Sequence, residues 1–295
     1  MEKRRLGATD MEVTRLGFGG ARIGFGQSTD QEADRLLNGL LDAGLNFIDT
    51  AACYAGSEEQ IGKAISGRRS DYYLATKAGH TVDGATGEEY SEQVISESID
   101  RSLERLKTDV LDLIQIHSCS VEVLLRGEAA DALVRAKKDG KTRYIGFSGD
   151  GDAAAESIGM GIFDTLQTSF NLVDQTAADE ILPMAMARGI GVIAKRPLAN
   201  AAFKRESSPT AYADEYWRRS NSMSAPEDAP DDPIEVALRF VLSFDEIDTA
   251  IFGTSSSAHA LETVALGEAG PLDPVAVGDL RRQFAVLGAE WGQLT

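Results

Sequence analysis

The chain has 295 residues, 43% of them hydrophobic, which suits one large globular domain or two small ones. Its formal net charge of −18 would repel nucleic acid and anionic membrane surfaces, which argues against a role at either. No apolar stretch approaches the roughly 20 residues of a membrane span, and the N-terminus lacks the apolar core of a secretory signal. The two cysteines, Cys53 and Cys119, imply no disulfide framework. These features predict a cytoplasmic protein with free thiols.

Strand-like and helix-like patterns alternate along the chain. An apolar run over 11–19 comes first, and a helix is expected over 30–43, opened by Thr29 and Glu32 in capping-box spacing and closed by Gly44. Further strands are expected at 46–50, 72–77, 111–117, 144–148, 164–171, 191–195 and 249–253. Further helices are expected at 58–66, 91–107, 121–138, 152–160, 177–187, 234–243 and 259–266.

Eight strand–helix alternations predict parallel strands joined by right-handed crossovers and closed into an α/β barrel of the (β/α)8 TIM type. A doubly wound open sheet is the alternative, with fewer repeats. We expect one domain spanning 1–295, with an N-terminal hairpin ahead of Gly7 that plugs the barrel bottom. The long loop 197–232, after the seventh strand, is expected to overhang the active face as a substrate-selecting lid, or else to be a disordered insertion.

Four polar residues lie at the C-terminal tips of consecutive predicted strands or just after one. Asp49, Lys77 and His117 end three strands, and Tyr54 follows Asp49 by five residues. Strand tips of a parallel barrel converge on the face where such folds do chemistry. An ammonium lowers the pKa of a nearby phenol, so Lys77, anchored by Asp49, would prepare Tyr54 for proton transfer. His117 would hydrogen-bond a substrate oxygen. The alternative for these residues is a structural ion pair at the barrel rim beside a half-buried loop aromatic.

Motifs for other chemistries are incomplete. Arg22 stands where G-x-G-x-x-G requires glycine, and GSEEQIGKA has one residue too many between its glycines for a P-loop. The three histidines lack zinc-site spacing, and no G-x-S-x-G is present.

The sequence resembles the aldo-keto reductase family over nearly its whole length. The most specific blocks are NFIDTAACYAGSEEQIGKA, ATK, LDLIQIH and GTSSS. The resemblance implies a barrel that binds NADP(H), or less often NAD(H), and interconverts aldehydes, ketones or sugars with alcohols without a metal. It implies that Tyr54 is the proton donor in reduction and the base in oxidation. Many relatives are monomers, and a small-molecule substrate is the expected partner.

The resemblance also implies where the nicotinamide end of the cofactor binds. In the family, a Ser-Asn pair after strand five and a Gln in strand six hold the carboxamide; Ser148 and Gln167 match, but Gly149 replaces the Asn. An aromatic residue usually stacks on the nicotinamide after strand seven. Here Lys195 stands in its place, followed by Arg196, and these cationic chains would instead meet the pyrophosphate.

The GTSSSAHALETV segment should contact the adenosine end, near a helix N-terminus that suits a phosphate. The residues expected there are Gly253, Thr254, Ser255, Ser256, His259, Glu262 and Thr263. His259 stands where NADP-preferring members often have Arg, and a neutral histidine binds a 2′-phosphate less firmly. NADP(H), which the resemblance implies, remains the expected cofactor, and the histidine leaves NAD(H) open.

Two other functions remain open from the sequence. A redox-sensing regulatory subunit would bind the cofactor with little turnover, as some relatives do. A Schiff-base aldolase would use Lys77 as its nucleophile. Both thiols are expected to be inert, with inhibition by oxidation of Cys119 as a further hypothesis.

Overall fold

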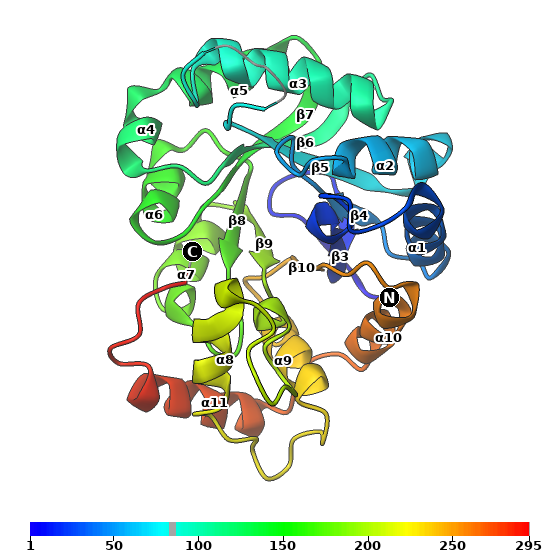
Figure 1. Ribbon diagram of the computed structural model, residues 1–295. Coiled ribbons are helices and arrows are strands. Elements are labelled where there is room, and N and C mark those ends of the chain that lie inside the picture. Colours follow the sequence, from blue (N-terminus) through cyan, green and yellow to red (C-terminus); the bar gives the residue numbers. More distant parts are fainter. Residues whose placement is uncertain (83–86, 295) are drawn as a thin grey trace.

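The computed structural model describes residues 1–82 and 87–294. In it, eight parallel strands form a closed barrel surrounded by helices (Figure 1). The barrel strands are β3 (Leu16–Gly19), β4 (Phe47–Asp49), β5 (Tyr73–Ala78), β6 (Leu111–His117), β7 (Thr142–Ser148), β8 (Thr165–Ser169), β9 (Gly191–Lys195) and β10 (Thr249–Phe252). Each strand pairs with its neighbour in sequence, and β10 closes the barrel on β3 with Phe252 opposite Phe18. The predicted eight-stranded barrel is confirmed.

The helices follow the strands as the periodicity predicts. They are α1 (Asp30–Asp42), α2 (Ser57–Ile65), α3 (Glu92–Leu106), α4 (Val121–Arg126), α5 (Glu128–Lys138), α6 (Gly151–Met160), α7 (Ile181–Ala187), α8 (Asp214–Ser220), α9 (Pro233–Leu242), α10 (Ser257–Glu268) and α11 (Pro274–Leu287). The capping box of α1 is present, since Thr29 and Glu32 bond reciprocally, and its leucines are buried. None of the described helices has the length and apolar character needed to cross a membrane.

An N-terminal hairpin closes the barrel floor, but it extends further than predicted. β1 (Lys3–Arg5) pairs antiparallel with β2 (Glu12–Thr14), so the turn passes through Gly7 instead of ending ahead of it. The apolar run 11–19 therefore contains two strands, β2 and the barrel strand β3. Gly7 has φ +53°, and a Cβ there would lie 2.2 Å from the backbone nitrogen of Gly191, so only glycine fits.

Three further differences from the predicted elements have local causes. The helix expected over 121–138 divides into α4 and α5 at Gly127, which adopts φ +81°. The loop 197–232 contains α8, with Tyr216 and Arg219 buried, so the disordered alternative is wrong for this part of the loop. The helix α11 lies beyond the barrel repeat and was not predicted.

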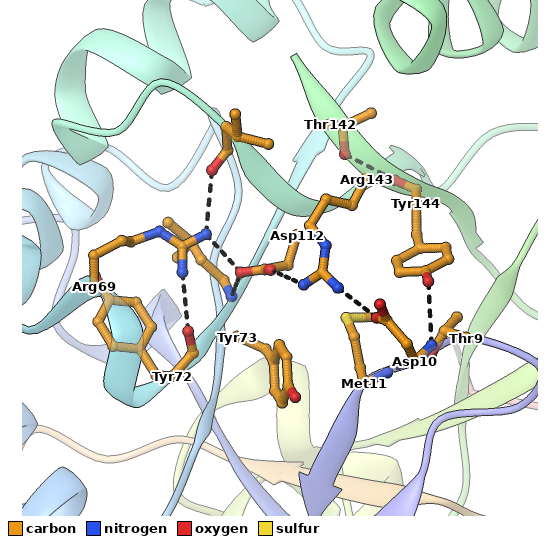
Figure 2. Close-up of polar contacts among 12 residues, drawn as sticks. Thr9, Asp10, Met11, Arg69, Tyr72, Tyr73, Asp112, Thr142, Arg143 and Tyr144 are labelled. Carbon is orange, nitrogen blue, oxygen red and sulfur yellow. Dashed lines mark hydrogen bonds and ion pairs between the residues drawn. The ribbon is translucent and has the colours of Figure 1, made fainter. Parts of the chain in front are cut away.

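An ion network ties the N-terminal ends of the strands to the hairpin (Figure 2). Asp112, at the start of β6, has a side chain only 6% exposed. Its carboxylate accepts from Arg69 Nη2 at 2.5 Å, Arg143 Nη1 at 2.6 Å and the Leu74 backbone N–H at 2.8 Å. Arg143 also bonds Asp10 in the hairpin turn. The network lies at the end of the barrel opposite the C-terminal ends of the strands. Residues at that end usually contribute to stability and not to catalysis.

Removing this carboxylate is expected to destabilise the fold. Asp112→Ala removes one acceptor from each of two guanidinium groups and the acceptor of one buried N–H, which should lower the free energy of unfolding by about 2–3 kcal/mol. Urea denaturation measures the loss. Asp245→Ala is the matched control, because Asp245 pairs with Arg4 at the exposed surface and its loss should cost less than about 1 kcal/mol. Equal losses in the two variants would contradict a special role for Asp112.

Candidate active site

A buried ion pair lies at the C-terminal ends of β4 and β5. Lys77 Nζ donates to Asp49 Oδ2 at 2.6 Å and to the Thr50 carbonyl at 2.9 Å. Both side chains of the pair are almost fully buried, at 1% and 2% exposure. Although burial disfavours the ammonium, the Asp49 carboxylate raises the pKa of Lys77 above its ordinary value. Lys77 is therefore a fixed positive charge at this end of the barrel.

The second oxygen of Asp49 is held by two amides. Gln167 Nε2 donates to Asp49 Oδ1 at 2.8 Å, and Gln115 Nε2 donates to the same atom at 3.3 Å. Gln115 was not among the site residues expected from the sequence. Its signal was the strand alternation, because Gln115 precedes His117 by two residues on β6 and therefore shares its face.

Tyr54 lies between the ion pair and His117. Lys77 Nζ is 5.4 Å from the centroid of the Tyr54 ring, and the Tyr54 and His117 rings meet edge to face with centroids 5.7 Å apart. Burial raises the pKa of Tyr54, while Lys77 lowers it. Lys77 thus acts in the predicted direction, but in this structure burial is the larger effect. The four residues come together as the strand ends predict.

His117 is neutral in this environment. Burial, followed by the charge of Lys77, lowers the pKa of His117 to about 2. Its Nδ1 atom lies 3.2 Å from Cys53 Sγ, and its ring meets the His80 ring with centroids 5.0 Å apart. A neutral imidazole has one N–H to donate, which suits a hydrogen bond to a carbonyl oxygen.

The residues expected to hold a carboxamide are adjacent. Ser148 Oγ donates to Gln167 Oε1 at 3.3 Å, and both side chains are buried. A Cβ at Gly149 would lie 2.4 Å from the Phe147 ring, so this position has no room for the Asn that the family pattern would place there. The Gln167 amide, which also bonds Asp49, joins this pair to the ion pair.

The two cations at the C-terminal end of β9, Lys195 and Arg196, already have partners within the protein. Lys195 Nζ lies 3.0 Å from Asp150 Oδ2, and Asp150 was not among the site residues expected from the sequence. Burial opposes ionisation of Asp150, but Lys195 and a backbone N–H from Ser169 outweigh it and lower the pKa of Asp150. Arg196, at φ +60°, donates to Ser169 Oγ and Tyr212 Oη.

The C-terminal tail 288–294 reaches these residues from α11. The Leu294 carbonyl accepts from Arg196 Nη1 at 2.9 Å, and the Leu294 N–H donates to Asp174 Oδ2 at 3.0 Å. Arg219 of α8 donates to the Gly292 carbonyl at 2.8 Å and lies over the Trp291 ring. The helix α8 of the loop 197–232 therefore packs against the C-terminal tail, and the tail contacts Arg196.

The segment 253–263 surrounds the N-terminus of α10, next to β3. Ser256 Oγ caps α10 by accepting from the His259 N–H, and Thr254 Oγ1 accepts from the Ser256 N–H. Thr263 Oγ1 donates to the His259 carbonyl within the helix. A Cβ at Gly253 would lie 3.0 Å from the Gly19 carbonyl. The side chains of His259 and Glu262 are exposed and have no polar partner within residues 1–82 and 87–294, which leaves them open to a ligand.

Other sites on the molecule do not match this chemistry. A cavity of about 400 Å³ lies at the opposite barrel end, lined by Arg4, Arg15 and Glu268 among others, and contains none of the four residues. Within the described part of the chain, no three His, Cys, Asp or Glu side chains are grouped to hold a metal ion.

The comparison with known proteins decides the family. The sequence model described as "Aldo/keto reductase family" matches residues 15–282. The chain belongs to the aldo/keto reductase family. L-galactose dehydrogenase of Arabidopsis thaliana is 31% identical over 283 residues, covering 90% of this chain and 88% of that protein. The NADH-specific methylglyoxal reductase of Escherichia coli is 30% identical over 220 residues, covering 67% of this chain and 68% of that protein.

A solved aldo/keto reductase has the same fold. The holo form of an enzyme from Bacillus halodurans superposes with a TM-score of 0.82 at 28% identity, covering 96% of each chain. D-threo-aldose 1-dehydrogenase of a Pseudomonas species is 27% identical, covering 85% of this chain and 88% of that protein. The resemblance and the barrel predicted from the sequence are confirmed, and the chain is a member of an oxidoreductase family.

Proposed function

We propose that this aldo/keto reductase interconverts a small carbonyl compound and its alcohol by hydride transfer with a nicotinamide cofactor. The observation that carries the proposal is the buried Lys77–Asp49 pair beneath Tyr54, beside a neutral His117. A phenol next to a fixed ammonium and a neutral imidazole donor is suited to protonating an oxygen that gains negative charge. The resemblance to the family gives Tyr54 that role.

In this mechanism each of the four residues Asp49, Tyr54, Lys77 and His117 has a separate role in proton transfer to the substrate oxygen. When bound, the cofactor would supply hydride to the carbonyl carbon in reduction and accept it in oxidation. The His117 N–H donates to the carbonyl oxygen and orients it. Tyr54 gives its phenolic proton to that oxygen, and Lys77 stabilises the resulting phenolate. Asp49 holds Lys77 in place, and Gln115 and Gln167 fix Asp49.

The residues around the barrel mouth suit a dinucleotide. Ser148 and Gln167 would hold the carboxamide, and Lys195 and Arg196 would lie near the pyrophosphate. The adenosine end would be held by Gly253, Thr254, Ser255, Ser256, His259, Glu262 and Thr263. The exposed side chains of His259 and Glu262 and the N-terminus of α10, capped by Ser256, support this assignment. NADP(H) is the preferred cofactor, and the NADH-specific relative keeps NAD(H) as the second choice.

The names of the relatives narrow the substrates to try. They include sugars (L-galactose and D-threo-aldoses) and a small dicarbonyl, methylglyoxal. We therefore propose a small aldehyde, ketone or sugar as substrate, acted on without a metal by a cytoplasmic protein that is a monomer or weak oligomer. The net charge of −18 fits a protein that binds neither nucleic acid nor anionic membrane surfaces.

Turnover of NADPH and NADH against a panel of aldehydes, ketones and sugars tests the function. The proposal expects cofactor oxidation that depends on a carbonyl substrate, and NAD(P)+ reduction with the matching alcohols. A protein that binds cofactor but turns over no substrate would instead fit the regulatory subunit. Borohydride trapping of a substrate on Lys77 would identify the aldolase.

The side chain at 259 is expected to set part of the cofactor preference. His259→Arg places a guanidinium at the exposed start of α10, where it would meet a 2′-phosphate bidentately. The Kd for NADPH, followed by fluorescence titration, should fall by about tenfold, and the Kd for NADH should change little. Equal effects on both cofactors would show that residue 259 does not meet the 2′-phosphate.

A further inference from the structure

The thiol of Cys53 contacts the imidazole of His117. Cys53 Sγ lies 3.2 Å from His117 Nδ1. Among the described residues, this is the only hydrogen bond that the His117 ring makes. Cys53 comes directly before Tyr54 in the loop between β4 and α2. Two backbone bonds fix that loop, from the Ala52 N–H to the Lys77 carbonyl at 3.0 Å and from the Tyr54 N–H to the Ala51 carbonyl at 2.9 Å. The sulfur therefore has a defined position beside the ring.

The His117 ring is also fixed from other sides. The Tyr54 ring meets it at an interplanar angle of 84° and the His80 ring at 70°, both edge to face. A ring held in this way presents Nδ1 to the sulfur, and its other nitrogen, Nε2, remains for another partner. The two nitrogens of a neutral imidazole have different roles, because one carries the proton and the other accepts.

The chemistry of the thiol decides which nitrogen carries the proton. Burial raises the pKa of the Cys53 thiol, so the sulfur keeps its hydrogen at neutral pH. Sulfur is a weak acceptor, whereas an unprotonated imidazole nitrogen is a good one. The favoured arrangement is thus S–H donating to Nδ1, with the ring proton on Nε2.

We infer that Cys53 is a positioning residue that holds His117 as the Nε2–H tautomer, so that the ring presents a donor to the substrate oxygen. The inference rests on the proposed function for its catalytic consequence. With the other tautomer, Nε2 would be an acceptor and would repel a carbonyl oxygen. Cys53 does not touch the substrate in this account, and it acts through His117.

Three variants separate this role from simple packing. Cys53→Ala removes the donor, and Cys53→Ser keeps a hydroxyl that donates to Nδ1. Cys119→Ala is the matched control, because Cys119 is a half-buried thiol that packs against the apolar core. Burial raises the pKa of Cys119 to about 12, so neither thiol is a ready nucleophile, which also argues against the oxidation hypothesis for Cys119.

The tautomer is measured directly by nitrogen NMR of protein labelled in histidine. The chain has three histidines, so His117→Gln assigns the resonances. The inference expects a protonated Nε2 and an unprotonated Nδ1 in the wild type, in Cys53→Ser and in Cys119→Ala, and a mixture in Cys53→Ala. A proton on Nδ1 in the wild type, or the same spectrum for His117 in Cys53→Ala, overturns it.

The catalytic consequence is measured on the same proteins. Losing one neutral hydrogen bond should lower kcat/KM of Cys53→Ala by about threefold to tenfold, with recovery in Cys53→Ser and no change in Cys119→Ala. An altered tautomer with unchanged kcat/KM would overturn the positioning role. A wild type with the Nε2–H tautomer but no turnover would overturn the proposed function, and the catalytic part of the inference with it.

Discussion

Tyr54→Phe is expected to lower kcat by about 10²–10⁴-fold, because it removes the proton donor and leaves the rest of the site in place. The phenyl ring would still pack edge to face on His117 and beside Phe25. Cofactor binding should therefore change little. Steady-state kinetics with a carbonyl substrate gives kcat, and fluorescence titration gives the Kd for NADPH.

The control for this variant is a tyrosine at the other end of the barrel. Tyr144 accepts from the Asp10 N–H at the N-terminal face, so Tyr144→Phe alters a hydroxyl without touching the site. Its kcat should match the wild type. Wild-type turnover by Tyr54→Phe would show that the phenol is not the acid–base group.

Lys77→Met is expected to affect both activity and stability. It leaves the Asp49 carboxylate buried without its ammonium, and breaking a buried ion pair in this way costs about 3–5 kcal/mol. It also removes the charge that would stabilise the Tyr54 phenolate, so turnover should be lost. Urea denaturation and single-turnover kinetics measure the two effects.

The double variant Lys77→Met/Asp49→Asn separates these two effects. Removing both charges leaves no unpaired ion, so most of the lost stability should return, while turnover should stay lost. Recovery of turnover in the double variant would show that the ammonium has no part in the reaction. A fully stable Lys77→Met would contradict the burial of the pair.

The barrel was predictable because its signals are local. The apolar periodicity, the Thr29 capping box and the glycines that follow some of the helices, such as Gly44 and Gly140, are all visible within short windows. The meeting of Asp49, Lys77 and His117 followed from the same pattern, since a residue that ends a parallel strand must lie at the barrel mouth. The hairpin was misplaced because its turn depends on a contact between Gly7 and Gly191, which are far apart in sequence.

The partners of the site residues were not predictable because they depend on contacts across the barrel. Asp150 follows β7 and Lys195 ends β9, so the two residues meet only once the barrel has formed. The sequence therefore predicted the cations Lys195 and Arg196 but not the carboxylate that pairs with Lys195. The tail that reaches Arg196 follows α11, which lies outside the strand–helix repeat. Strand alternation could have placed Gln115 on the same face of β6 as His117, but nothing in the sequence marks it as a partner of Asp49.

Transfer of deuterium from NADPH that carries two deuterium atoms at C4 of the nicotinamide would show whether hydride passes from the cofactor to the carbonyl carbon. The wild type and Tyr54→Phe would be incubated with an aldehyde or sugar that the wild type turns over, and the alcohol analysed by mass spectrometry and NMR. We expect one deuterium on the carbinol carbon with the wild type and almost no product with Tyr54→Phe. Product without deuterium on that carbon, or equal labelled product from both proteins, would contradict it.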